Sequence, residues 1–137
     1  MKKKLLSLLL AAAMLLTLAA CGESPVTGTD ATATEPVVIL HTNDVHGAIE
    51  NYAKVAVLAD RYAADGAYVL VLDAGDYSQG DSTVSLSQGA AAIELMNMVG
   101  YDAAALGNHE FDYGYEVLKT NMASAQFPVL AANVLYN

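Results

Sequence analysis

Residues of the types that bind metal ions are concentrated in three short segments of the chain. The first segment contains Asp44 and His46, the second contains Asp76 directly after a glycine, and the third contains Asn108 and His109. Carboxylate, imidazole and amide groups are common ligands of divalent cations such as Zn, Mn, Fe and Mg. About thirty residues separate consecutive segments, roughly one strand-helix-strand step, so all three can meet at one edge of a parallel sheet. We therefore expect a shared metal site at that edge.

Strand and helix patterns alternate around these segments. Apolar runs predict strands at residues 37–43, 68–74, 102–106 and 127–134, and the first of these runs is rich in β-branched residues. Apolar residues at helical spacing predict helices at residues 51–64, 88–99 and 115–125. Asp65 and Gly66 should end the first helix, and His41 is expected to pack inside the first strand. This alternation predicts an α/β fold with mainly parallel strands and right-handed βαβ crossovers, whose ligands bind beyond the carboxyl ends of the strands.

The three segments follow the pattern D-x-H, G-D, G-N-H-[ED], and in this they resemble the calcineurin-like metallophosphoesterases. Residues 39–47 and 107–112 are most similar to the secreted 5'-nucleotidase and 2',3'-cyclic phosphodiesterase family. The resemblance implies that residues 37–137 form the N-terminal half of a metallophosphoesterase αββα sandwich. It also implies a hydrolase that acts on nucleotides or other small phosphoesters, with two divalent metal ions activating a water.

The same resemblance assigns a role to each metal-binding residue. Asp44 and His46 would bind the first metal ion, Asp76 would bridge the two ions, and Asn108 would bind the second. Each assignment has a structural alternative. Aspartate at the end of a strand often caps the next helix, and asparagine beside glycine often adopts a left-handed turn.

The residues around the third segment have other expected roles. The resemblance implies that His109 contacts the phosphate and helps the leaving oxygen depart, and that Asp112 orients it. A carboxylate on one imidazole nitrogen fixes the tautomer and stabilises the cationic form. Asp112 could instead cap the helix that begins near residue 115. Glu110 is expected to hold the metal ligands in place without binding a metal ion itself. Residues 79–81 have no assigned role.

The first twenty residues have the pattern of an export signal. Three lysines precede the apolar residues 5–18, a stretch shorter than the roughly 20 residues that span a bilayer. Residues 18–21 resemble the bacterial lipobox, in which Cys21 becomes the lipidated N-terminus. The alternative is an ordinary signal followed by a free thiol. Residues 21–36 are predicted to consist of the lipidated cysteine followed by a linker. The linker is expected to be flexible because these residues have no apolar period. The protein would then be anchored to the outer face of a bacterial membrane, in the cell envelope.

The acidic composition limits the possible partners. Removal of the signal leaves three basic and fifteen acidic residues, a formal charge of −12 with neutral histidines. This charge argues against a nucleic-acid polymer as partner. It does not argue against a nucleotide, because bound cations can reverse the local potential.

Two further functions fit parts of the sequence. A lipoprotein solute-binding module would have the same lipobox, linker and α/β domain, but it would not need three converging polar segments. A degenerate, non-catalytic family member is the other alternative.

The family also requires downstream histidines and a nucleoside-binding domain, so we expect this chain to be an inactive N-terminal fragment of a longer protein. Nucleoside monophosphates, cyclic nucleotides and nucleotide sugars stay open as substrates, as do the metal identity and the oligomeric state.

Overall fold

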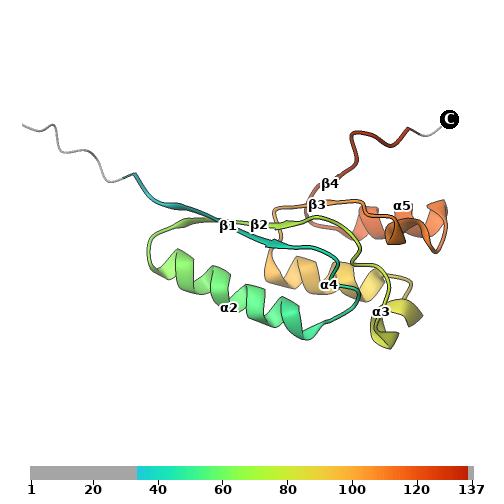
Figure 1. The fold of residues 1–137 in the computed structure, drawn as a ribbon, viewed down its shortest axis with the longest axis horizontal. Helices are drawn as coiled ribbons and strands as arrows, with labels where there is room; N and C mark the ends of the chain where they lie inside the picture. The colour runs from blue at the N-terminus through green and yellow to red at the C-terminus, as the bar shows by residue number, and fades with distance from the viewer. Residues whose placement is uncertain (1–33, 136–137) are drawn as a thin grey trace, which may run out of the picture. The chain divides into compact units, whose positions relative to one another are not determined.

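The computed structural model describes residues 34–135, which contain one four-stranded parallel sheet. The predicted signal, Cys21 and nearly all of the linker lie outside the described residues. The strands follow one another across the sheet in chain order (Figure 1). They are β1 (Val37–Thr42), β2 (Tyr68–Asp73), β3 (Ala103–Ala105) and β4 (Val129–Leu130). The predicted α/β fold with parallel strands is confirmed.

Helical segments connect the strands. They are α2 (Glu50–Ala64), α3 (Ser82–Leu86), α4 (Ala90–Val99), the short 3₁₀ helix η1 (His109–Phe111) and α5 (Tyr115–Ser124). Within residues 34–135, no helix combines the length and apolar character needed to cross a membrane.

Local sequence signals fix the ends of these helices. As expected, α2 ends at Asp65 and Gly66, and Gly66 adopts a left-handed φ of 84°. The Asp81 carboxylate accepts the Thr83 N–H at 2.9 Å and caps α3, a contact that contributes about 1 kcal/mol. Helix α4 ends at Gly100, whose φ of 82° is typical of a glycine helix cap.

Helix α4 packs against both α2 and α5. This arrangement is the one expected for right-handed crossovers between parallel strands that are added in chain order. Figure 1 shows α2 and α4 together beneath one face. On the other face, Val37, Ile39 and Tyr68 are 63%, 58% and 59% exposed. In the predicted αββα sandwich, a second sheet would pack against this face.

The expectation for His41 was wrong. We expected a packed strand histidine, but its side chain is exposed. Side chains of one strand alternate between the two faces, and His41 shares a face with Val37 and Ile39. That face is the exposed one, because the alternate residues of β1 are the partly buried ones.

The strand register places the carboxyl ends of β1, β2 and β3 side by side. Thr42 at the end of β1 pairs with Asp73 at the end of β2, and Asp73 pairs with Ala104 of β3. The loops that follow these strands therefore leave from the same edge of the sheet. This places Asp44 and Asp76 at the same end, as the sequence predicted.

Two predicted elements differ from the structure, and two short helices were not predicted. The predicted strand at 127–134 is reduced to β4, because a turn with a 3.2 Å bond from the Val134 N–H to the Ala131 oxygen follows it. The predicted helix at 88–99 begins only at Ala90, because Gln88 and Gly89 have left-handed φ angles of 52° and 89°. Neither α3 nor η1 was predicted; both occupy loops between longer elements.

Candidate metal centre

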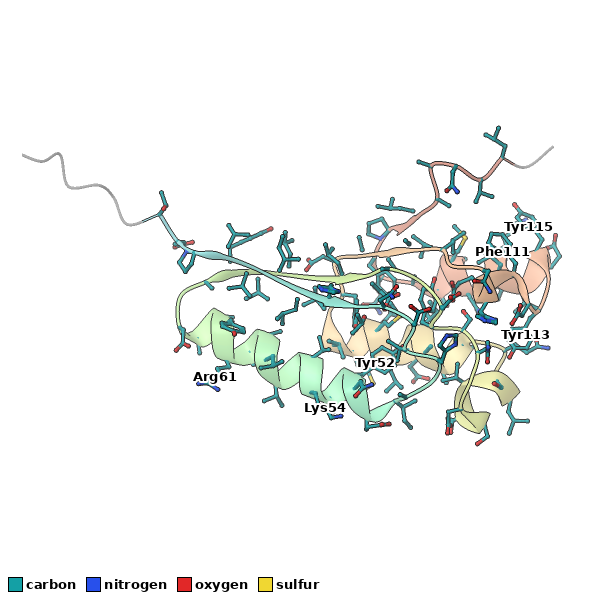
Figure 2. The ribbon with its side chains drawn as sticks, in the orientation of Figure 1. Tyr52, Lys54, Arg61, Phe111, Tyr113 and Tyr115 are labelled. Atoms are coloured by element: carbon teal, nitrogen blue, oxygen red, sulfur yellow. The ribbon has the colours of Figure 1, made fainter. Side chains whose placement is uncertain are left out.

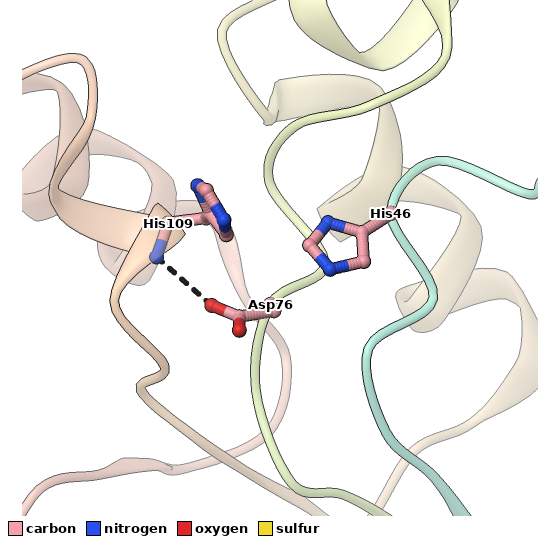
Figure 3. A group of neighbouring side chains, drawn as sticks. All are labelled: His46, Asp76 and His109. Atoms are coloured by element: carbon pink, nitrogen blue, oxygen red, sulfur yellow. Dashed lines mark hydrogen bonds between the residues drawn. The ribbon is translucent and has the colours of Figure 1, made fainter.

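The three polar segments meet at the carboxyl edge of the sheet. One ligand atom from each of His46, Asp76 and His109 lies within 4.8 Å of the other two (Figure 3). The Asp76 carboxylate also accepts the backbone N–H of His109 at 2.9 Å. The two imidazole rings are edge-to-face, with centroids 5.1 Å apart. Asp44 lies beside this group, because its Oδ1 is 3.7 Å from Nε2 of His46.

The backbone at three of these residues is in the left-handed region. Asp44, His46 and Asp76 have φ angles of 51°, 46° and 61°. Such conformations cost about 1–3 kcal/mol each for residues other than glycine, and they occur preferentially at functional sites. Two hydrogen bonds between the loops hold them: the Asp44 N–H donates to Gly75 O and the His46 N–H to Asp76 O, both at 3.1 Å. The fold thus maintains strain at the residues that sequence analysis selected as metal ligands.

Two glycines allow the second and third segments to approach closely. A Cβ on Gly75 would lie 2.5 Å from the backbone nitrogen of Gly107. A Cβ on Gly107 would lie 2.3 Å from Asp76 Oδ1. Both positions therefore require glycine if Asp76 is to stay against the third segment.

The Glu110 carboxylate connects the second and third segments through hydrogen bonds. Its side chain is only 3% exposed, although it carries a carboxylate. This carboxylate accepts backbone N–H groups from two loops, those of Asp76 at 2.9 Å, Tyr77 at 2.9 Å, Ser78 at 3.1 Å and Gly107 at 2.6 Å. A buried charge needs such compensation, and several N–H donors provide it. Glu110 thus holds the backbone of Asp76 in place.

Asp73 is a supporting residue that the sequence analysis missed. It is 4% exposed, and its Oδ1 accepts the Gly75 N–H at 2.7 Å. The Thr42 hydroxyl donates to its other oxygen, and the Tyr101 hydroxyl lies 2.8 Å from that of Thr42. Burial raises the pKa of Asp73 to about 6. The available signal was a carboxylate at the last position of an otherwise apolar strand.

His109 and Asp112 form the expected pair. Nδ1 of His109 lies 2.6 Å from Oδ2 of Asp112, and this hydrogen bond raises the pKa of His109 above its ordinary value. The contact favours a proton on Nδ1 and leaves Nε2 for another partner. The alternative role of Asp112 is wrong, because Gly114 is the N-cap of α5.

The capping alternatives for the metal-binding residues also fail. Helix α2 has Ile49 at its N-cap and α3 has Asp81, so neither Asp44 nor Asp76 caps a helix. Asn108 has right-handed φ and ψ angles of −77° and −31°, and its exposed side chain makes no capping bond at η1. Its amide oxygen is therefore not used by the local backbone.

The donors and the local charge fit a divalent cation. Carboxylate oxygen and imidazole nitrogen converge from different loops, a donor set that suits Zn, Mn or Fe. The basic side chains Lys54 and Arg61 project from the outer side of α2 (Figure 2), and Lys54 donates to Asn51 at 2.8 Å. Neither is paired with a carboxylate of the site, so the negative charge there is available to a cation.

Comparison with known proteins agrees with this geometry. Residues 37–136 match the calcineurin-like phosphoesterase family. A 5'-nucleotidase of Vibrio cholerae is 38% identical over 95% of this chain and 26% of its own length. A snake venom 5'-nucleotidase of Gloydius brevicauda is 41% identical over 72% of the chain and 20% of its own length.

A solved structure gives the same result. The 5'-nucleotidase precursor of Thermus thermophilus superposes with a TM-score of 0.65 and 36% identity, over 69% of this chain and 22% of that one. The chain thus spans about a quarter or less of the length of these relatives. The sequence pattern, the parallel sheet and the family match lead to one conclusion: the chain belongs to the calcineurin-like phosphoesterase family.

Proposed function

We propose that the protein is a metal-dependent hydrolase of nucleotide phosphoesters that works through a dinuclear metal site. The observation that carries this proposal is the convergence of His46, Asp76 and His109 from three loops at one edge of the sheet. Relatives described as 5'-nucleotidases support a nucleotide as substrate.

In this proposal each of the two cations has its own ligands, and one residue is shared between them. Asp44 and His46 would hold the first ion, Asp76 would bridge both, and Asn108 would hold the second. The convergence of His46 with Asp76, and the 3.7 Å between Asp44 Oδ1 and His46 Nε2, support these roles. When bound, the cations would supply an activated water and positive charge for the transferred phosphoryl group.

His109 would act on the leaving group. Asp112 occupies Nδ1, so Nε2 is the nitrogen that can donate a proton to the departing oxygen. The hydrogen bond that His109 donates to the Asp112 carboxylate raises the pKa of His109, which favours the protonated form that such a donor needs. Asp112 would therefore act only through the imidazole, by orienting it and stabilising its charge.

The direct test is phosphate release by the intact natural protein. With Mn²⁺ or Zn²⁺ present, it should release inorganic phosphate from 5'-AMP, and EDTA should abolish that release. Adding either metal back after dialysis should restore it, because the cations supply the attacking water. Hydrolysis that persists after metal has been removed would contradict the proposal, as would the absence of hydrolysis with every metal tested.

We also propose that the protein is lipid-anchored through Cys21 to the outer face of a bacterial membrane. The support is the lipobox-like sequence at 18–21 and the apolar segment before it. The anchor would place the domain where nucleotides outside the cell are available, and nucleic-acid polymers would be excluded by the negative charge.

Changing Cys21 to serine tests the anchor. In a bacterium that processes lipoproteins, Cys21→Ser should move the protein from the membrane fraction to a soluble or uncleaved form, because no thiol remains to carry the lipid. Fractionation followed by immunoblotting measures this, with Ser24→Ala as the matched control. A wild-type protein found only in the soluble fraction would rule out the anchor.

A further inference from the structure

Gln79 lies against the ring of His109, in a segment to which sequence analysis assigned no role. Its side-chain Nε2 is 3.2 Å from Nδ1 of His109 and 3.4 Å from Nε2. An atom almost equally far from both ring nitrogens cannot lie in the ring plane, because it would collide with Cε1 between them. The amide therefore packs over the face of the imidazole, where it does not compete with the bond from Nδ1 to Asp112 and does not block Nε2 in the plane of the ring.

The backbone around Gln79 is held firmly in place. The Gly80 N–H donates to Ser85 Oγ at 3.1 Å, and that hydroxyl donates back to the Gly80 oxygen at 3.3 Å. The next residue, Asp81, donates its N–H to the His46 oxygen at 3.0 Å. These bonds connect residues 79–81 both to α3 and to the loop that contains His46.

Gly80 shows how closely the two loops approach. A Cβ at this position would lie 1.9 Å from the backbone oxygen of His46, and its φ of 125° also favours glycine. Residues 79–81 therefore cannot shift relative to His46 without breaking this contact. The amide of Gln79 is thereby presented to His109 from a fixed point.

We propose that Gln79 is a positioning residue for His109, which fixes the rotation of the imidazole by packing on its face. Asp112 restrains the ring at Nδ1, but one hydrogen bond still permits rotation about the axis through that bond. The Gln79 amide on the face and the His46 ring at 5.1 Å oppose this rotation. Nε2 is then kept directed away from Asp112, toward the group that receives its proton. This role rests on the function proposed for His109.

A spectroscopic test does not depend on catalysis. In intact protein labelled with ¹⁵N-histidine and loaded with diamagnetic Zn²⁺, the ring signals that vanish in His109→Asn identify His109. The wild type should give one narrow set with the proton on Nδ1. Gln79→Ala should broaden or split this set, whereas Gln126→Ala, a change at an exposed glutamine in the loop before β4, should not. Identical wild-type and Gln79→Ala ring signals would overturn the proposal.

A double-mutant cycle tests the consequence for turnover. Gln79→Ala should lower kcat for 5'-AMP by about tenfold to a hundredfold, with KM within about twofold, because a misplaced proton donor affects the transition state more than binding. For p-nitrophenyl phosphate, whose leaving group needs little protonation, the loss should be smaller. In the His109→Asn background, Gln79→Ala should cause no further loss.

The possible outcomes separate this proposal from the proposed function. Equal losses with and without His109 would overturn the positioning role, because Gln79 would then act independently of the imidazole. A wild-type protein without hydrolase activity would refute the proposed function alone, since the ring signals would still decide whether Gln79 holds His109.

Discussion

Replacing Asp76 by asparagine should lower phosphoester hydrolysis by the intact protein by about 10³-fold or more, and added metal should not restore it. In the proposed site a single carboxylate serves both cations, and asparagine offers one neutral oxygen instead of two charged ones. Losing several kcal/mol of charge stabilisation corresponds to a decrease of this size. The fold should survive, because an asparagine oxygen can still accept the His109 N–H that Asp76 accepts at 2.9 Å.

The measurement is metal content by mass spectrometry, together with steady-state phosphate release. Asp60→Asn, an equivalent change at an exposed position of α2, is the matched control and should keep both metals and activity. Thermal unfolding of the two variants should be similar in the absence of metal. An Asp76→Asn protein that retains two metal ions per chain would contradict the bridging role.

Replacing His109 by asparagine should have a different effect. The metal content should be unchanged while kcat for 5'-AMP decreases by about 10²- to 10⁴-fold, the usual contribution of a positioned proton donor. The decrease should be smaller for p-nitrophenyl phosphate, since its leaving group departs without protonation. Comparing kcat for the two substrates at saturating metal measures the difference.

Asp112→Asn provides the matched comparison for this prediction. It should show a milder form of the same defect, because Asp112 acts on the reaction only through the ring that it contacts at 2.6 Å. Loss of metal from His109→Asn would instead make His109 a metal ligand, which its position within 4.8 Å of His46 and Asp76 also permits sterically. The metal content thus decides between the two roles.

The position of the site could be predicted from sequence because its determinants are local. Apolar runs identified β1 and β2. The spacing of about thirty residues between consecutive polar segments indicated that one strand-helix-strand step separates them. The rule that parallel strands place their ligands at the carboxyl edge then brought Asp44 and Asp76 together. Even β3, which consists of three alanines and has weak strand propensity, was predicted within residues 102–106, because strand and helix patterns alternate along the chain.

The parts that could not be predicted depend on contacts between segments distant in sequence. A supporting role for Glu110 was expected only from the family resemblance, because its carboxylate accepts N–H groups from residues more than thirty positions away and no local pattern indicates that it is buried. The contact between Gln79 and His109 likewise arises only after two loops fold against each other. His41 was misjudged because periodicity shows that a strand has two faces but not which face is covered.

The central claim is a dinuclear site bridged by Asp76. Anomalous diffraction from crystals of the intact protein grown with Mn²⁺ or Zn²⁺ tests it most directly. We predict two anomalous peaks about 3.5–4 Å apart, with the Asp76 carboxylate between them, Asp44 and His46 on one ion and Asn108 on the other. A single peak without Asp76 among its ligands, or two peaks at a different edge of the sheet, would contradict the claim.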